Sequence, residues 1–292
     1  MKIRDILKEK PVTISCEIFP PKKDADFEGV VAAARSIAAL HPDFISVTYG
    51  ASGGTSQNTV KIASMIQQEM GVTSIAHLTC ASSTREQVRE VIGEIRSAGV
   101  ENILALRGDI PTGADFPVPN QFRYASELIA EIRAGGDFCI GGACYPEGHV
   151  ECASREEDLD HLKAKVDMGC DFLTTQMFFD NSLLYRFLYR AMAHGITVPV
   201  LAGIMPVTNS KQIRRITQLS GTQLPMRFLT MLDKFGDNPA AMKQAGIAYA
   251  TEQIIDLISN GVRGIHLYTM NKPDIAAAIF QNLSHVLGRE EA

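Results

Sequence analysis

Tryptophan is absent from this sequence, and aromatic residues make up only 7% of it. Its own absorbance near 280 nm is therefore weak, so a bound chromophore would be conspicuous. No apolar stretch approaches the roughly 18 residues that a membrane-spanning helix needs. The first ten residues alternate charges with single apolar residues and lack the hydrophobic region of a signal peptide. We therefore expect a cytoplasmic protein with no membrane association.

The sequence also lacks the signatures of several binding classes. With 28 basic and 33 acidic residues and no Lys/Arg run, it offers no footprint for nucleic acid. It has no Gly-x-Gly-x-x-Gly after the first apolar run and no Walker motif. Cys144, His149 and Cys152 have no second pair at zinc-ligand spacing, so we predict no metal site. The six cysteines lie mostly in apolar runs, which indicates reduced, buried thiols.

What the chain does contain is a regular alternation of short β-rich runs and helical patterns. The expected strands are Val12–Phe19, Phe44–Tyr49, Ser74–Cys80, Asn102–Arg107, Phe138–Tyr145, Asp171–Gln176, Val198–Met205 and Gly264–Tyr268. The expected helices are Phe27–Leu40, Val60–Met70, one that begins at a Thr84 N-cap, Tyr124–Arg133, Glu156–Met168, Leu183–His194, Lys211–Leu219, Met226–Phe235, Ala241–Asn260 and Pro273–Leu287.

The order of these elements predicts the fold class. Helical crossovers of this length require parallel strands. Alternating strands and helices form either an open doubly wound sheet or a closed barrel, and eight units in 292 residues favour the barrel. We predict an α/β protein, a single (β/α)8 TIM barrel over residues 1–292, with extra helices between strands 7 and 8.

Polar and ionisable residues gather where the apolar runs end. In such a barrel the chemistry lies at the carboxyl ends of the strands and in the loops after them. Seven of the eight expected strands end in this way, which predicts a ligand-lined mouth. The residues are Glu17, Thr48, Tyr49, His77, Thr79, Arg107, Gly108, Asp109, Tyr145, Glu147, His149, Gln176, Tyr268, Thr269 and Asn271.

Three of these positions have both a functional and a structural interpretation. Glu17 lies between Cys16 and Ile18, where loss of solvent favours a protonated carboxyl that can act as a general acid. Its structural alternative is a carboxylate paired with Arg107 or a lysine. The segment Arg107–Asp109 permits close approach of a ligand at Gly108, or braces its loop by an internal ion pair. His77 alone is typical of a buried, hydrogen-bonded imidazole.

Other segments give weaker signals. Asp158, His161 and Lys165 share one face of the helix Glu156–Met168, which is either solvated or close enough to the rim to bind a pyrophosphate. The glycine-rich segment Gly50–Thr55 is a weak phosphate signal and is more typical of a flexible loop. Met177–Phe179 is more typical of packing than of a cofactor contact.

Eight short motifs, in order and each at an expected strand end, give a stronger signal together than any does alone. They are Ser15–Pro21, Ser46–Ala51, His77–Cys80, Leu106–Pro111, Ala143–His149, Thr175–Asp180, Gly203–Pro206 and Tyr268–Asn271. On these motifs the chain resembles bacterial methylenetetrahydrofolate reductases over essentially its whole length.

The resemblance implies a barrel that binds FAD and reduces 5,10-methylenetetrahydrofolate to 5-methyltetrahydrofolate with NADH or NADPH. In the family, hydride passes through flavin N5 and the two substrates use one site in turn. The flavin supplies the difficult chemistry and the protein orients it. The family also implies a homo-oligomer.

Matched by motif, Glu17 is similar to the general acid of the family and Asp109 to a carboxylate at the flavin. The implied flavin contacts are Thr48, His77, Arg107, Gly108, Asp109, Tyr124, Ala143, Tyr145, His149, Asp158, His161 and Lys165. The implied substrate contacts are Glu17, Asp109, Gln176, Gln212 and Tyr268. The sequence departs from the common family pattern at Ile216, His161 and Ala164.

Two alternatives remain open at this point. One is a barrel enzyme that acts on a pterin without flavin, which would explain Asp109 but not the helix with Lys165. The other is a flavin subunit that receives electrons from a partner protein.

Overall fold

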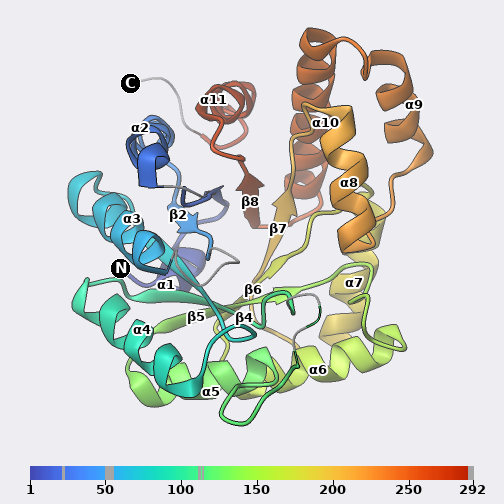
Figure 1. Ribbon diagram of the computed structural model, residues 1–292. Coiled ribbons are helices and arrows are strands. Elements are labelled where there is room, and N and C mark those ends of the chain that lie inside the picture. Colours follow the sequence, from blue (N-terminus) through green and yellow to red (C-terminus); the bar gives the residue numbers. More distant parts are fainter. Residues whose placement is uncertain (22–23, 50–55, 111–112, 114, 289–292) are drawn as a thin grey trace.

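The computed structural model describes residues 1–21, 24–49, 56–110, 113 and 115–288 (Figure 1). The glycine-rich segment Gly50–Thr55 lies outside these residues, so the phosphate signal assigned to it stays a prediction.

Eight parallel strands close into a barrel in sequence order. Each strand pairs with the next, and the last pairs with the first, so the barrel has no free edge. In this register Glu17 lies beside Ser46 on one side and beside Tyr268 on the other. The strands are β1 (Thr13–Ile18), β2 (Phe44–Val47), β3 (Ser74–Thr79), β4 (Asn102–Leu106), β5 (Cys139–Cys144), β6 (Phe172–Thr175), β7 (Val200–Ile204) and β8 (Gly264–Tyr268).

Helices surround the barrel (Figure 1). They are α1 (Ile3–Glu9), the short 3-10 helix η1 (Asp24–Asp26), α2 (Phe27–Ala38), α3 (Ser56–Glu69), α4 (Arg85–Ser97), α5 (Ala125–Gly135), α6 (Arg155–Asp167), α7 (Asn181–Ala193), α8 (Ser210–Ser220), α9 (Met226–Phe235), α10 (Pro239–Ser259) and α11 (Pro273–Asn282). Three of them, α8 to α10, lie between β7 and β8, as the sequence predicts.

Local sequence explains most helix boundaries. Thr84 accepts a hydrogen bond from Gln87 N while the Gln87 side chain accepts one from Thr84 N, which confirms the predicted capping box. Helix α10 begins earlier than expected, at Pro239, because Asn238 caps it and proline suits the first helical turn. Helix α11 ends at Asn282, and turns follow where the sequence predicts more helix.

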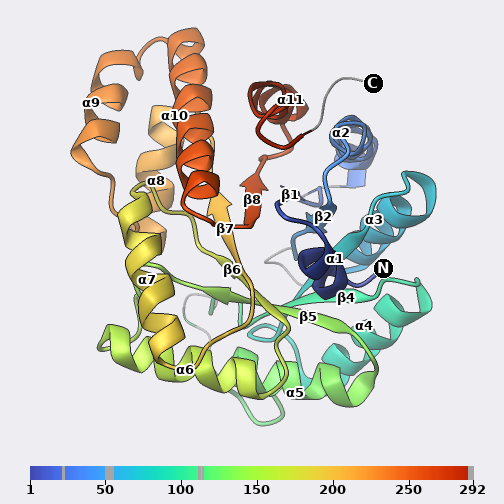
Figure 2. The same cartoon turned by 180° about the vertical axis from the view of Figure 1, so that it is seen from behind.

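Helix α1 is the element that the sequence pattern did not predict. It lies across the amino-terminal opening of the barrel, in the foreground of Figure 2. Ile3 and Leu7 pack against residues near the starts of the strands, among them Phe44, Phe172 and Leu201. Seven residues are too short for a reliable periodic signal, so the tertiary contact rather than the pattern fixes this helix.

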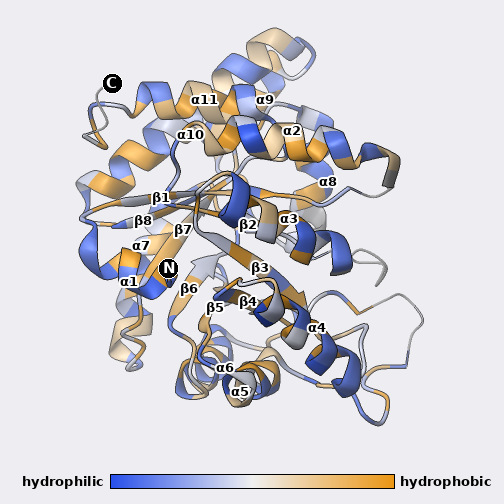
Figure 3. Ribbon diagram, turned by 90° about the vertical axis from the view of Figure 1, so that its left-hand side faces the viewer, coloured by the Kyte–Doolittle hydropathy of each residue, from blue (hydrophilic) through white to orange (hydrophobic). Residues whose placement is uncertain are grey.

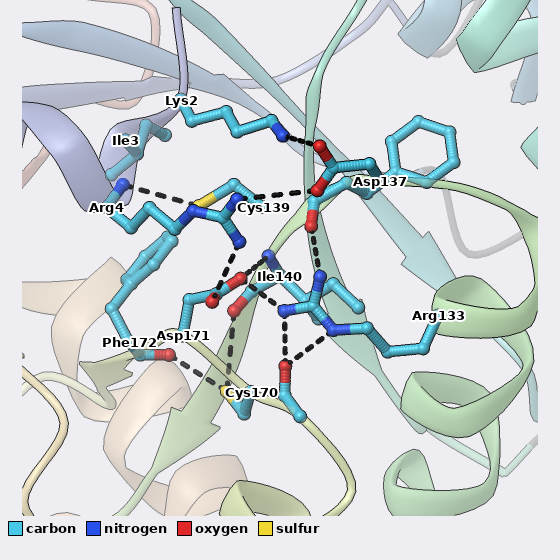
Figure 4. Close-up of polar contacts among 12 residues, drawn as sticks. Lys2, Ile3, Arg4, Arg133, Asp137, Cys139, Ile140, Cys170, Asp171 and Phe172 are labelled. Carbon is cyan, nitrogen blue, oxygen red and sulfur yellow. Dashed lines mark hydrogen bonds and ion pairs between the residues drawn. The ribbon is translucent and has the colours of Figure 1, made fainter.

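An ion-pair network fastens this segment to the barrel (Figure 4). The Asp171 carboxylate binds Arg4 Nη1 at 3.2 Å and Arg133 Nη2 at 2.5 Å, and it also accepts a hydrogen bond from Ile140 N at 2.8 Å. Lys2 pairs with Asp137. The network joins α1, α5 and the starts of β5 and β6.

The hydrophobic core lies between the strands and the surrounding helices. The helices show both apolar and polar segments in the hydropathy colouring, as expected of helices with one buried face (Figure 3). A separate apolar cluster lies between the ends of β6 and β7 and the inserted helices α8 to α10, and it includes Met177, Phe179, Val207 and Phe228. This confirms the packing interpretation of Met177–Phe179. Within the described residues, no helix combines the length and apolarity needed to cross a membrane.

Candidate functional site

The predicted mouth of the barrel forms at the carboxyl ends of the strands. Since all eight strands are parallel, their ends meet on one rim, opposite α1. The rim brings together Glu17 from β1, His77 from β3, Gln176 after β6 and Tyr268 from β8. These residues are far apart in the sequence, and only closure of the barrel makes them neighbours.

Glu17 lies in a buried polar cluster. Its side chain is only 8% exposed, and its Oε2 lies 3.5 Å from His266 Nε2, 3.5 Å from Ser46 Oγ and 3.6 Å from His77 Nε2. The structural alternative that paired Glu17 with Arg107 or a lysine is wrong, because Arg107 binds Glu151 instead. No ion pair with a permanent cation holds the Glu17 carboxyl in its charged form among the described residues.

His266 links Glu17 to Ser15. Ser15 Oγ lies 3.1 Å from the carbonyl oxygen of Ile265 and 2.8 Å from His266 Nδ1, so its one hydrogen serves one of these two acceptors. His266 Nε2 lies 3.5 Å from Glu17 Oε2. The His266 ring thus lies between the Ser15 hydroxyl and the Glu17 carboxyl. Sequence analysis missed Ser15 and His266, which read as ordinary positions of apolar strands.

His77 is buried and neutral. Its residue exposure is 5%, and burial lowers its pKa to about 4. Its Nε2 has no hydrogen-bond partner among the described residues. A buried, unsatisfied ring nitrogen is costly. A ligand at this position would complete the site. The expected burial of His77 is confirmed, but the expected hydrogen bond is missing at Nε2 among the described residues.

The β4–α5 loop begins with Arg107, Gly108 and Asp109. Arg107 forms two parallel bonds with Glu151, of 2.5 and 2.6 Å, and these raise the pKa of Arg107. The predicted ion pair within Arg107–Asp109 is therefore wrong. Gly108 has φ 83°, and a Cβ there would lie 3.0 Å from Thr79 Cβ, so this turn requires glycine. Asp109 is exposed.

The β5–α6 loop provides an aromatic pair. The rings of Tyr145 and His149 meet edge to face with centroids 4.6 Å apart. Burial raises the pKa of Tyr145 to about 12 and lowers that of His149, so both rings are neutral near pH 7. Glu147, in the same loop, accepts a hydrogen bond from Gln223 N, which ties the loop to the segment after α8.

Helix α6 packs its Asp158, His161 and Lys165 beside β5 and the β5–α6 loop. Cys152 Sγ lies 3.7 Å from both Asp158 Oδ1 and His161 Nδ1. The His161 ring stacks on Tyr124 with centroids 6.3 Å apart. Lys165 Nζ donates to the carbonyl of Ala143 at 2.6 Å, and burial lowers the pKa of Lys165.

The ends of β6 and β8 carry polar side chains that lie beside an apolar cluster. Tyr268 donates its hydroxyl to Thr175 O at 2.6 Å, and its ring passes over Gly203, where a Cβ would lie 2.8 Å from the phenol oxygen. Gln176 Oε1 accepts from Met177 N at 2.9 Å. The amide NH2 of Gln176 is therefore the part left to donate to a ligand.

A small hollow lies above this side, between the β7–α8 and β8–α11 loops. Gln212 and Ile216 line it from α8, and Lys272 lines it from the β8–α11 loop. Lys272 Nζ lies 3.0 Å from Thr208 Oγ1. Gln212 thus lies on the wall of a hollow beside the β7–α8 loop. In the part of the chain that the structure describes, no three His, Cys, Asp or Glu residues are grouped to hold a metal ion.

Comparisons with known proteins agree with this arrangement. A family model described as methylenetetrahydrofolate reductase matches residues 2–284. The chain is 35% identical to the 5,10-methylenetetrahydrofolate reductase of Pectobacterium carotovorum subsp. carotovorum, over 93% of this chain and 90% of that protein. It is 34% identical to the Escherichia coli (strain K12) protein of the same description, with the same coverage.

A plant relative and a solved structure extend the comparison. Methylenetetrahydrofolate reductase (NADH) 1 of Arabidopsis thaliana is 35% identical over 97% of this chain but only 50% of that protein. The solved structure is an uncharacterized protein from Clostridium thermocellum that binds two copies of 5-methyl-5,6,7,8-tetrahydrofolic acid. It has a TM-score of 0.67 at 14% identity and covers 99% of this chain and 100% of that one. At this identity the likeness shows a common fold.

Proposed function

Since the chain belongs to the methylenetetrahydrofolate reductase family, we propose how its own rim residues serve the reaction of that family. The reaction reduces 5,10-methylenetetrahydrofolate to 5-methyltetrahydrofolate. We propose FAD as the cofactor, NADH or NADPH as the electron donor, and residues 1–292 as one catalytic unit. The observation that carries the proposal is the buried carboxyl of Glu17, which lies among His266, Ser46 and His77 with no permanent cation paired to it among the described residues.

The side chains along β3 to α6 fit an FAD molecule. A diphosphate needs cations and N–H donors, and Lys165 has three N–H groups of which Ala143 takes one. His77 Nε2 gives a further polar atom that a ligand would satisfy. The proposed FAD contacts are Thr48, His77, Arg107, Gly108, Asp109, Tyr124, Ala143, Tyr145, His149, Asp158, His161 and Lys165. When bound, the flavin would accept hydride from NAD(P)H and return it to the folate, with both substrates using one site in turn.

Glu17 supplies the proton that the folate requires. Opening the five-membered ring of the substrate to an iminium places negative charge on the departing nitrogen, and a nearby acid relieves it. Glu17 is screened from solvent on this rim, and His266 Nε2 lies 3.5 Å from its Oε2. In this proposal Glu17 is the acid, His266 Nε2 exchanges a proton with it, and the Ser15 hydroxyl holds the ring at Nδ1.

The folate would bind through complementary polar groups. Asp109 offers an acceptor for pterin N–H groups, and Gln176 offers its amide NH2 as a donor. Tyr268 offers the faces of its ring, because its hydroxyl is committed to Thr175. Gln212 would contact the substrate from the wall of the hollow.

The setting of the reaction is also a proposal. None of the six cysteines, all of which lie within the described residues, forms a disulfide, and five are buried, which supports a reducing, cytoplasmic environment. We further propose a homo-oligomer.

The test is the visible spectrum of the purified protein before and after anaerobic NADH or NADPH. We expect flavin bands that bleach with one of the two nucleotides and recover when 5,10-methylenetetrahydrofolate is added. A flavin that resists both nucleotides would favour electron delivery by a partner protein. A colourless protein that cannot be reconstituted with FAD would overturn the proposed cofactor.

A further inference from the structure

Glu151 is not among the predicted site residues, but its carboxylate binds one of them, Arg107, through both oxygens. It lies in the β5–α6 loop, two residues after His149, and its side chain is 53% exposed. Both of its oxygens bind Arg107, at 2.5 and 2.6 Å, in the planar forked geometry that arginine forms with carboxylates. The Arg107 side chain is only 21% exposed, so the pair is more than a mobile surface contact.

The same residue is fixed through its backbone. Glu151 N donates to His149 Nδ1 at 3.2 Å, so this ring carries its hydrogen on Nε2. Arg107 is held at its other end, because Cys80 N and Ala81 N both donate to its carbonyl. Glu151 therefore joins two loops that each provide proposed FAD contacts.

The guanidinium keeps capacity for a ligand. It has five N–H groups. Counting bonds among the described residues, Nε–H goes to Gly108 O and two others go to Glu151, which leaves two. Glu151 thus orients Arg107 without exhausting its donors, and it offsets the positive charge of Arg107.

We propose that Glu151 is a positioning residue for the flavin. It holds Arg107 in one orientation across the β4–β5 part of the rim and sets how much uncompensated positive charge the flavin experiences. This inference rests on the proposed FAD site.

Orienting Arg107 and offsetting its charge predict two separate effects of removing Glu151, a lower FAD affinity and a higher flavin reduction potential. Without Glu151, Arg107 must be ordered when FAD binds, which weakens binding. The uncompensated guanidinium charge then favours added electrons, which raises the flavin reduction potential. A residue that only braced a loop would weaken binding and leave the potential in place.

The test compares three variants by FAD titration of apoprotein and by the midpoint potential of the bound flavin. For Glu151→Gln we expect FAD binding to weaken about tenfold, as for loss of a well-formed charged contact, with a more positive potential that shifts most at low ionic strength. Glu151→Asp keeps the charge, so affinity should fall while the potential stays near wild type. Arg107→Lys should weaken binding by loss of the fork.

The matched control is Glu157→Gln. Glu157 Oε2 accepts a hydrogen bond from Ala153 N in the same loop, whereas Arg107 binds Glu151. This control should leave the potential unchanged. Equal changes in both Gln variants, or no change in affinity and potential for Glu151→Gln, would overturn the inference. If Glu151→Gln fails to fold, Glu151→Asp still tests the split between affinity and potential. A wild-type protein that binds no FAD would instead overturn the proposed function.

Discussion

At the scale of single residues, the chemistry of this protein depends on which groups form hydrogen bonds with each polar side chain. A carboxyl in an apolar strand is only a candidate acid until its partners are known. Here the partners are His266 and Ser46, neither of which carries a permanent charge. The Ser15 hydroxyl lies 2.8 Å from His266 Nδ1 and holds the ring whose Nε2 faces Glu17.

Glu17→Gln should separate the two half-reactions. The amide cannot release a proton to the folate, but it keeps the size of the side chain. We expect flavin reduction by NAD(P)H to stay near wild type and folate reduction to fall by about 100-fold or more. Anaerobic stopped-flow spectroscopy of each half-reaction measures this. Equal loss in both would indicate a structural role for Glu17.

His266→Asn should slow the same half-reaction and change its pH dependence, because Nε2 no longer exchanges the proton with Glu17. The double variant with Glu17→Gln should be little slower than Glu17→Gln alone, since residues that act as a unit are not additive. Single-turnover folate reduction across pH measures both effects. Full additivity in the double variant would contradict proton exchange between Glu17 and His266.

His77 should make the protein acid-sensitive. Its folded-state pKa of about 4 lies below the ordinary 6.5, so between these values only the unfolded chain takes up a proton. Stability should be unaffected by His77 above pH 6.5 and fall as pH drops toward 4, by roughly 3 kcal/mol in total. The free energy of unfolding, measured with urea between pH 4 and pH 7, should change less steeply with pH in His77→Asn than in the wild type. An unchanged slope would count against a buried, neutral His77.

At the scale of elements, helix packing determines where small residues are required. In α10, a Cβ at Gly246 would lie 1.7 Å from Val207 O, so this helix touches the backbone of the β7–α8 loop. In α4, a Cβ at Gly93 has no heavy atom within 4 Å. The same residue type thus serves close packing in one helix and leaves open space in another.

Glycine-to-alanine substitutions in these two helices should change the stability of the protein in opposite directions. Gly93→Ala should stabilise the protein by about 0.5–1 kcal/mol through helix propensity. Gly246→Ala should destabilise it by roughly 1–3 kcal/mol, since the helix must move away from Val207. Val207 also lines the hollow at the rim, so folate binding should weaken in this variant only. Thermal denaturation and folate titration measure the contrast, and matching signs would refute it.

At the scale of the whole molecule, the two ends of the barrel have separate tasks. The carboxyl ends of the strands carry the polar rim, while α1 and its ion pairs close the opposite opening. Ile3, Ile6 and Leu7 are each at most 7% exposed. Stability and chemistry therefore depend on different ends of the same strands.

Ile3→Ala should test this separation. Removing a fully buried side chain from the base should cost about 2–5 kcal/mol. FAD affinity, measured on the folded fraction, should stay close to wild type because the site lies at the other end. Denaturant unfolding and FAD titration give the two values, with the exposed Glu9→Ala as control. A parallel loss of affinity would show that the two ends are coupled.

The sequence by itself determined the order and type of the elements, since the alternation of β-rich runs and amphipathic helices is a local pattern that recurs along the chain. It also determined which strand ends are polar, and so the place of Glu17, His77 and Gln176. Only the tertiary structure decided their partners. Glu17 meets His266, Arg107 meets Glu151, and α1 covers the base because closure of the barrel joins residues that no local pattern relates.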